Sequence, residues 1–100
     1  MLDFDRIVGF EWDQGNARKS IDKHGVDQPE VEQLFFNTPL LLTDDTSHSE
    51  AEPRHHALGQ TNTARPLHVT FTLRRDRTLI RVISARGMSR KERTRYAQEA

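Results

Sequence analysis

Arginine side chains supply most of the chemistry that this sequence offers. Guanidinium groups bind phosphate in a bidentate manner and can stabilise negative charge that develops on phosphorus. A strand residue such as Arg81, which stands among apolar neighbours, is hard to bury unless it is paired. It therefore indicates either a site or an ion pair. The alternative is a set of solvated surface arginines, some of them paired with carboxylates. The candidates for phosphate contact are Arg54, Arg65, Arg81, Arg86, Arg90 and Arg93.

Lys23 and His24 stand just before Gly25 and form a second candidate site. Imidazole titrates near neutral pH and can transfer protons, and a desolvated lysine can act as a base. The alternative is structural, because cations suit the last turn of a helix and glycine suits the left-handed residue after it. The residues alone leave both interpretations open.

Four further histidines raise the question of a metal site. Their spacings match no zinc signature, and the chain contains no cysteine. If His55 and His56 lie on a strand, their side chains point to opposite faces. We therefore expect no metal or other cofactor. The four residues are His48, His55, His56 and His68.

Composition and charge narrow the class of protein. The 100 residues suit a single domain, residues 1–100, and a hydrophobic content of 34% predicts a thin core. Residues 1–64 hold five basic and twelve acidic residues, whereas residues 65–100 hold ten basic and three acidic ones. This asymmetry indicates contact with nucleic acid or another charged partner, unless the two halves neutralise each other. With no long apolar run and no secretory signal, we expect a cytoplasmic protein without membrane contact.

Two adjoining segments predict the centre of a sheet. Residues Leu67 to Leu73 alternate strictly between apolar and polar, which is typical of a strand with one buried face. The apolar run from Thr78 to Ala85 predicts a neighbouring strand, and the short connection at 75–77 predicts a hairpin. Ser89 and Glu92 have the spacing of a capping box, so a basic helix should begin near Arg90.

The remaining patterns complete an α+β domain with a central twisted antiparallel sheet, N-terminal helices packed on it and a basic C-terminal helix. Asp13 and Asp27 have residue types that cap helices, and Glu30 completes a box with Asp27. Tyr96 closes the basic helix, where it would either stack on a base or simply pack the helix onto the domain. The other expected elements are an edge strand at Phe10 to Trp12, helices from Asn16 and Asp27, strands at 40–43 and 54–60, and an exposed loop from Asp44 to Pro53.

Several motifs together resemble the BrnT family. They are F-E-W-D at 10–13, K-H-G-V at 23–26, Arg54 followed by A-L-G at 57–59, Arg65 before the alternating strand, and I-R-V-I-S-A-R-x-x-S-R-K-E-R-x-R-Y at 80–96. The resemblance covers nearly the whole chain, and the C-terminal run is its most specific part. The chain departs from the family pattern at Ser20, Ala64 and Gly87, and the lost cation at Gly87 would weaken RNA affinity.

The resemblance implies a toxin of a type II toxin–antitoxin module with a RelE-like fold. Such a toxin would be a metal-independent endoribonuclease that inhibits translation by 2′-hydroxyl attack on the adjacent phosphorus. Its partner would be a BrnA-like antitoxin, a ribbon-helix-helix DNA-binding protein. An antitoxin dimer would give a heterotetramer that contacts operator DNA only through the antitoxin.

On this hypothesis, arginines from separate segments converge on one phosphodiester. Arg81 and Arg86 would stabilise charge, and Arg54 and Arg65 would hold the scissile phosphate. Lys23 or His24 would transfer protons. Binding of the RNA backbone would fall to Arg90, Arg93 and Tyr96. Two alternatives remain open: a non-catalytic module that binds nucleic acid or antitoxin, and a histidine-dependent metal hydrolase.

Overall fold

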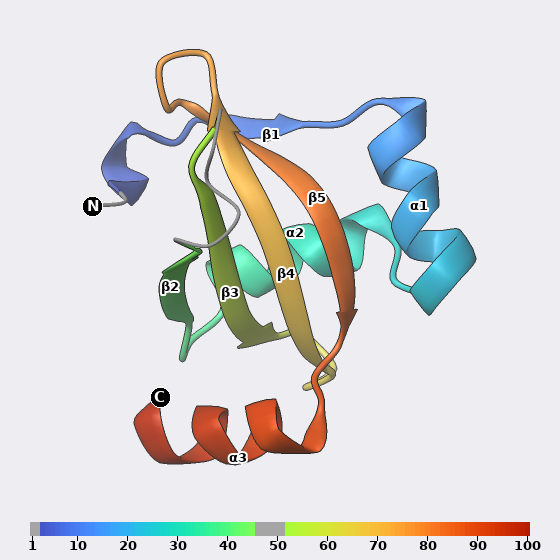
Figure 1. The fold of residues 1–100 in the computed structure, drawn as a ribbon, viewed down its shortest axis with the longest axis vertical. Helices are drawn as coiled ribbons and strands as arrows, with labels where there is room; N and C mark the ends of the chain where they lie inside the picture. Colours follow the sequence, from blue (N-terminus) through green and yellow to red (C-terminus); the bar gives the residue numbers. More distant parts are fainter. Residues whose placement is uncertain (1–2, 46–51) are drawn as a thin grey trace.

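A five-stranded sheet forms the centre of the protein. The computed structural model describes residues 3–45 and 52–100, with the side chains of residues 19–23 also outside the description. The strand order is β1-β5-β4-β3-β2. The strands are β1 (Gly9–Glu11), β2 (Leu41–Asp45), β3 (Arg54–Gln60), β4 (Pro66–Arg74) and β5 (Leu79–Gly87). Figure 1 shows α2 behind this sheet and α3 across one end of it.

Three α-helices and one short 3-10 helix complete the fold. They are η1 (Phe4–Arg6), α1 (Gln14–His24), α2 (Gln28–Phe36) and α3 (Arg90–Glu99). Both predicted capping boxes are present, because Asp27 pairs with Glu30 at the start of α2 and Ser89 pairs with Glu92 at the start of α3. Gly25 follows α1 with a φ of 63°, a left-handed conformation that glycine adopts without steric cost. No helix among the described residues is long and apolar enough to cross a membrane.

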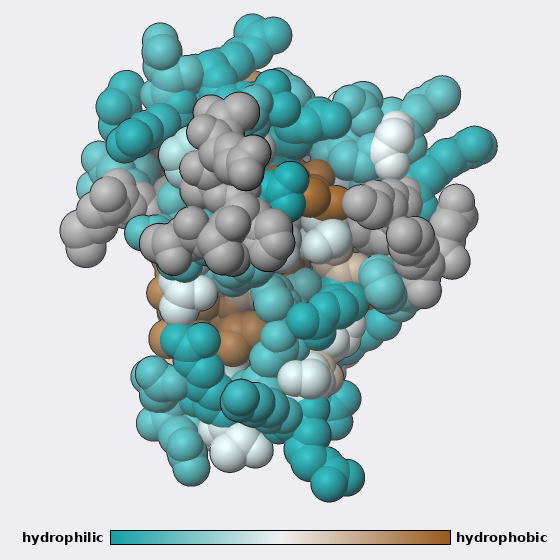
Figure 2. Space-filling model, in the orientation of Figure 1, coloured by the Kyte–Doolittle hydropathy of each residue, from teal (hydrophilic) through white to brown (hydrophobic). Residues whose placement is uncertain are grey.

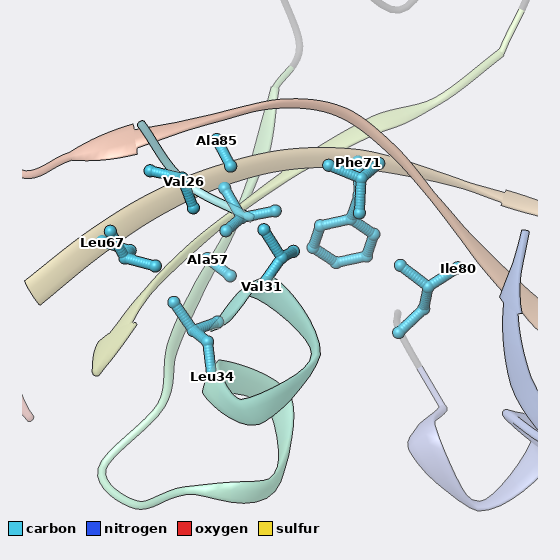
Figure 3. Packing of buried hydrophobic residues seen from close by; sticks show 10 residues of the cluster. Val26, Val31, Leu34, Ala57, Leu67, Phe71, Ile80 and Ala85 are labelled. Carbon is cyan, nitrogen blue, oxygen red and sulfur yellow. The ribbon is translucent and has the colours of Figure 1, made fainter. Parts of the chain in front are cut away.

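The hydrophobic core lies between α2 and one face of the sheet. Leu34 and Val31 point from α2 towards the strands in Figure 3, where Phe71 and Ala57 meet them. Gly59 allows the close approach, because a Cβ atom at that position would stand 2.7 Å from Leu34 Cγ. The apolar residues of the alternating segment Leu67 to Leu73 therefore all lie on this one face of the sheet.

The opposite face of the sheet carries the polar side chains, and we call it the polar face. A bulge between the Thr70 and Phe71 pairings makes Ser84 the partner of Thr70 and Val82 the partner of Phe71. The extra residue, Ile83, shifts the alternation of β5 by one position, so that residues 81 and 86 share a face. Figure 2 shows the side viewed in Figure 1 to be largely hydrophilic. Residues whose strand positions place them on the polar face include Asp45, Arg54, His56, His68, Thr70, Thr72, Arg81, Ser84 and Arg86.

The α+β class is confirmed, with three differences from the predicted elements. Strands β2 to β5 are antiparallel, but β1 pairs with β5 in parallel, so the sheet is mixed. Asp44 and Asp45 belong to β2 and pair with His55 and Arg54, which shortens the expected loop at its start. Residues 46–51 of that loop lie outside the described residues. Helix α1 begins at Gln14, two residues earlier than predicted.

Candidate active site on the polar face of the sheet

Arg86 is fixed on the polar face by Glu92 from α3. The two guanidinium nitrogens Nη1 and Nη2 donate to the two carboxylate oxygens of Glu92 at 2.8 and 2.9 Å. This bidentate arrangement holds the guanidinium plane in one orientation. The hydrogen bond from Arg86 is the largest reason that the pKa of Glu92 falls to about 2. Because 39% of the Arg86 side chain is exposed, the cation remains accessible from solvent.

His68 lies beside this pair on β4, opposite Arg86 in the strand register. Its Nδ1 is 2.6 Å from Glu92 Oε2, which is the distance of a charge-assisted hydrogen bond in which the imidazole donates. The same Nδ1 is 2.8 Å from Arg86 Nη2. Two donors cannot hydrogen-bond each other, so Arg86 donates to Glu92 and not to the protonated nitrogen. Burial lowers the pKa of His68 even though the Glu92 carboxylate raises it.

His56 on β3 lies between His68 on β4 and Asp45 on β2 and contacts both. Its Nδ1 is 2.9 Å from His68 Nε2 and 3.0 Å from the Thr70 hydroxyl. Its Nε2 is 3.0 Å from Asp45 Oδ2. The two imidazoles therefore form a hydrogen-bonded chain between the carboxylates of Asp45 and Glu92. This chain links four elements, because its members come from β2, β3, β4 and α3.

Arg81 shares the polar face but is already paired. It donates to Glu11 at 3.0 Å and to Asp13 at 2.8 Å. The hydrogen bond to Asp13 is the main reason that the pKa of Arg81 is raised. In turn, a backbone hydrogen bond from Asn16 and the contact with Arg81 lower the pKa of Asp13. Arg81 thus ties the parallel strand β1 and the start of α1 to the sheet.

Arg54 stands at the start of β3, two residues before His56 and directly opposite Asp45. Alternation along the strand gives Arg54 and His56 the same face. The structure therefore brings three of the four predicted arginines of the strands and their flanks, Arg54, Arg81 and Arg86, to the polar face. The fourth is elsewhere.

Arg65 is a clamp between two turns and not part of the polar face. Its Nη1 is 2.9 Å from Glu30 Oε2 and also donates to the carbonyl of Gly25 at 3.0 Å. Its Nη2 donates to the carbonyl of His24 at 3.4 Å. These bonds join the turn before β4 to the connection between α1 and α2. Burial raises the pKa of Glu30, but the hydrogen bonds from Arg65 and from the Asp27 backbone outweigh burial and lower it.

The remaining predicted site residues lie on helices. His24 ends α1 and is exposed, and the side chain of Lys23 is outside the described residues. Arg90 and Arg93 are exposed on α3. The hydroxyl of Tyr96 donates to the carbonyl of Pro39, and burial raises the pKa of Tyr96. That contact corresponds to the packing interpretation, in which Tyr96 anchors α3 beside β2.

Sequence reasoning missed His56, His68, Asp45 and the second role of Glu92. A usable signal existed for His68, which occupies a polar position of the best alternating strand. His56 required knowledge of the strand pairing, because it meets His68 only when β3 lies beside β4. Within the described residues, no group of three or more His, Cys, Asp or Glu side chains is arranged to hold a metal ion.

Comparison with known proteins identifies the family and the fold. Residues 12–92 match the family described as ribonuclease toxin, BrnT, of type II toxin–antitoxin system. The fold is similar to that of the Brucella abortus ribonuclease toxin BrnT in its crystal structure, with a TM-score of 0.59 and 24% identity over 83% of this chain and 99% of that chain. No curated protein matches the sequence significantly. The family match covers most of the chain, which therefore belongs to the BrnT family of ribonuclease toxins of type II toxin–antitoxin systems.

Proposed function

We propose that this toxin is a metal-independent endoribonuclease that inhibits translation in the cytoplasm. The RNA 2′-hydroxyl attacks the adjacent phosphorus, and the 5′-oxygen of the next nucleotide leaves. The observation that carries the proposal is the accessible Arg86 guanidinium, which Glu92 holds in one orientation on the polar face near the end of β5. A cation fixed before the reaction stabilises the dianionic transition state without a cost of reorganisation.

Arg54 supports Arg86 on the same face. Its position opposite Asp45 places a second guanidinium near the rim of the histidine chain. Two such groups can contact the scissile phosphate and its neighbour. Arg81 and Arg65 have structural roles in this proposal, because each joins separate segments. Arg81 ties β1 and the start of α1 to the sheet, and Arg65 ties the turn before β4 to the connection between α1 and α2.

Helix α3 supplies the RNA-binding surface next to this site. Its exposed cations include Arg90 and Arg93, and the helix begins directly after β5, which carries Arg86. Lysine and arginine contacts to phosphates are independent of base sequence and sensitive to salt. We therefore assign these two arginines to the RNA backbone and leave the chemistry to the sheet.

A type II toxin has a cognate antitoxin, and we propose that it is BrnA-like. The partner would carry a ribbon-helix-helix DNA-binding domain and, as a dimer, would hold two toxin molecules in a heterotetramer. Operator DNA would contact the antitoxin alone. Size-exclusion chromatography with light scattering of the co-expressed complex measures this stoichiometry.

The test of the activity uses purified toxin, a defined RNA and an excess of chelator. Cleavage that persists with EDTA and leaves 2′,3′-cyclic phosphate and 5′-hydroxyl ends supports the proposal. RNA that is bound but left intact supports the non-catalytic alternative instead. Activity that is lost with chelator and restored by a metal ion would contradict metal independence.

A further inference from the structure

The hydrogen bonds of His56 and His68, which lie between Asp45 and Glu92, determine how many protons the two imidazoles hold. Glu92 is ionised at neutral pH, since its pKa is about 2, and at the other end the Asp45 carboxylate lies 3.0 Å from His56 Nε2. Each carboxylate requires an N–H facing it, which places one proton on His68 Nδ1 and one on His56 Nε2. The contact of 2.9 Å between the other two nitrogens requires one more proton, because two lone pairs or two N–H groups would repel.

Three protons on four ring nitrogens mean that the pair carries one positive charge. We assign the third proton to His56 Nδ1, because that nitrogen faces two possible acceptors, His68 Nε2 at 2.9 Å and the Thr70 hydroxyl at 3.0 Å. At rest, His56 is therefore an imidazolium that donates to His68 Nε2, and His68 is neutral. The Thr70 hydroxyl, 3.0 Å from His56 Nδ1, accepts from the same N–H. The charged groups around the pair are Asp45 from β2, Arg54 from β3, Arg86 from β5 and Glu92 from α3.

A protonated imidazole and a neutral one, side by side, are what RNA cleavage by a 2′-hydroxyl needs. The neutral ring accepts the proton of the nucleophile, and the charged ring donates a proton to the leaving oxygen. His68 lies next to Arg86, since its Nδ1 is 2.8 Å from Arg86 Nη2, and its Nε2 joins it to His56 Nδ1 at 2.9 Å. The His56 and His68 side chains are 26% and 15% exposed and lie on the same face as the Arg86 guanidinium.

We propose that His68 is the general base and His56 the general acid of this ribonuclease. The inference rests on the proposed function and names the residues that move its protons. The rings separate as the phosphodiester binds. His68 Nε2 takes the proton of the 2′-hydroxyl while the 2′-oxygen forms a bond to phosphorus. His56 Nδ1 gives its proton to the 5′-oxygen as the bond from that oxygen to phosphorus breaks.

The pair also explains how the enzyme would be regenerated. After cleavage, His68 holds the extra proton and His56 is neutral, so the total charge of the pair has not changed. When the product leaves and the 2.9 Å contact forms again, the proton passes from His68 Nε2 to His56 Nδ1. Asp45 and Glu92 hold the outer nitrogens throughout and keep each ring in the required tautomer.

The experiment compares two RNA substrates under single-turnover conditions. One has the natural 5′-oxygen leaving group, and the other has a bridging 5′-sulfur, which departs without protonation. We expect His56→Asn to lose about 100-fold or more on the oxygen substrate and to recover most of that loss on the sulfur substrate. His68→Asn should be slow on both substrates, because each reaction still needs the base.

His55→Asn is the matched control, because His55 is the neighbour of His56 on β3 but faces the other side of the sheet. It should retain the wild-type rate on both substrates. His24→Asn tests the competing assignment of proton transfer to the end of α1. Melting temperatures accompany every rate, and His56→Gln replaces His56→Asn if the latter does not fold.

Three results would overturn the assignment of the pair. They are wild-type rates for both His→Asn variants, an equal loss of His56→Asn on both substrates, or a rate loss confined to His24→Asn. In each of these cases the wild type still cleaves RNA, and the ribonuclease proposal stands. A folded wild type that cleaves neither substrate would instead overturn the ribonuclease proposal together with this inference.

Discussion

Glu92 is the residue through which helix α3 and the Arg86 guanidinium fix each other. The same carboxylate accepts two hydrogen bonds from Arg86, one from His68 and one from the backbone of Ser89 at the helix N-terminus. A capping residue, which would ordinarily only begin a helix, here also orients the proposed catalytic cation. The position of α3 and the geometry of the site are therefore coupled.

This coupling predicts how stability depends on acid. The pKa of Glu92 is about 2 in the folded protein against 4.5 as the reference value, so folding favours the ionised form. A depressed pKa contributes stability that is fully present above pH 4.5 and is lost as the pH falls towards 2. We expect a loss on the order of 2 kcal/mol over this window. Urea denaturation between pH 5 and 2.5 measures it.

Glu92→Gln is the comparison for that experiment, because it keeps the hydrogen-bonding shape and removes the charge. The variant should be less stable than wild type at pH 6 and should approach it as the pH falls. If wild type and variant lose stability in parallel across the whole range, the carboxylate does not contribute as described.

Gly59 is predicted to be essential for packing. A methyl group there would meet Leu34 Cγ at 2.7 Å, and Leu34 is fully buried in the core. Gly59→Ala should therefore cost about 1–3 kcal/mol of unfolding free energy. Gly87→Ala is a matched control, since its nearest contact would be the Pro66 carbonyl at 4.0 Å. Equal denaturation midpoints for the two variants would show that α2 can shift to accommodate a methyl group.

Arg65 should matter for stability and not for the chemical step. Arg65→Ala removes an ion pair with Glu30 and two bonds to backbone carbonyls. The Arg65 side chain is 37% exposed, so solvent weakens the ion pair and we expect a loss of about 1 kcal/mol. A double-mutant cycle with Glu30→Ala isolates their coupling. A large fall in the single-turnover rate of the folded Arg65→Ala protein would instead return this residue to the active site.

The arginines of α3 should make RNA affinity depend more steeply on salt concentration. Each phosphate contact on a single strand adds about 0.7 to the magnitude of the slope of log affinity against log salt. Arg90→Ala and Arg93→Ala should each lower the magnitude of the slope by about that amount. Arg18→Ala, which removes an exposed cation from α1, should leave it unchanged. Fluorescence anisotropy at several salt concentrations measures all three.

Most of the local structure could be predicted from the sequence, because helix caps, turns and hairpins depend on residues close together in the chain. The capping boxes at Asp27 and Ser89, the turn at Gly25 and the β4–β5 hairpin were all predicted, and all are present. The parallel pairing of β1 with β5 was not predicted, since it joins segments about 70 residues apart and no short-range signal records it.

The site was less predictable because it depends on register. The adjacent apolar residues Val82 and Ile83 interrupt the alternation of β5, but only the strand pairing shows that a bulge there puts Arg81 and Arg86 on the same face. The contact between His56 and His68 likewise exists only through the pairing of β3 with β4. Residue types indicated which arginines to consider, and only the fold shows that Arg81 and Arg86 share the polar face while Arg65 lies elsewhere.

The central claim is that a rigid, accessible Arg86 stabilises the transition state of RNA cleavage. The single-turnover rate of Arg86→Ala measures it most directly, with EDTA present and Arg95→Ala as the control, because Arg95 pairs with Glu99 along the surface of α3. We predict a fall of roughly 100- to 1000-fold for Arg86→Ala and a wild-type rate for Arg95→Ala. Cleavage by folded Arg86→Ala at the wild-type rate would contradict the account.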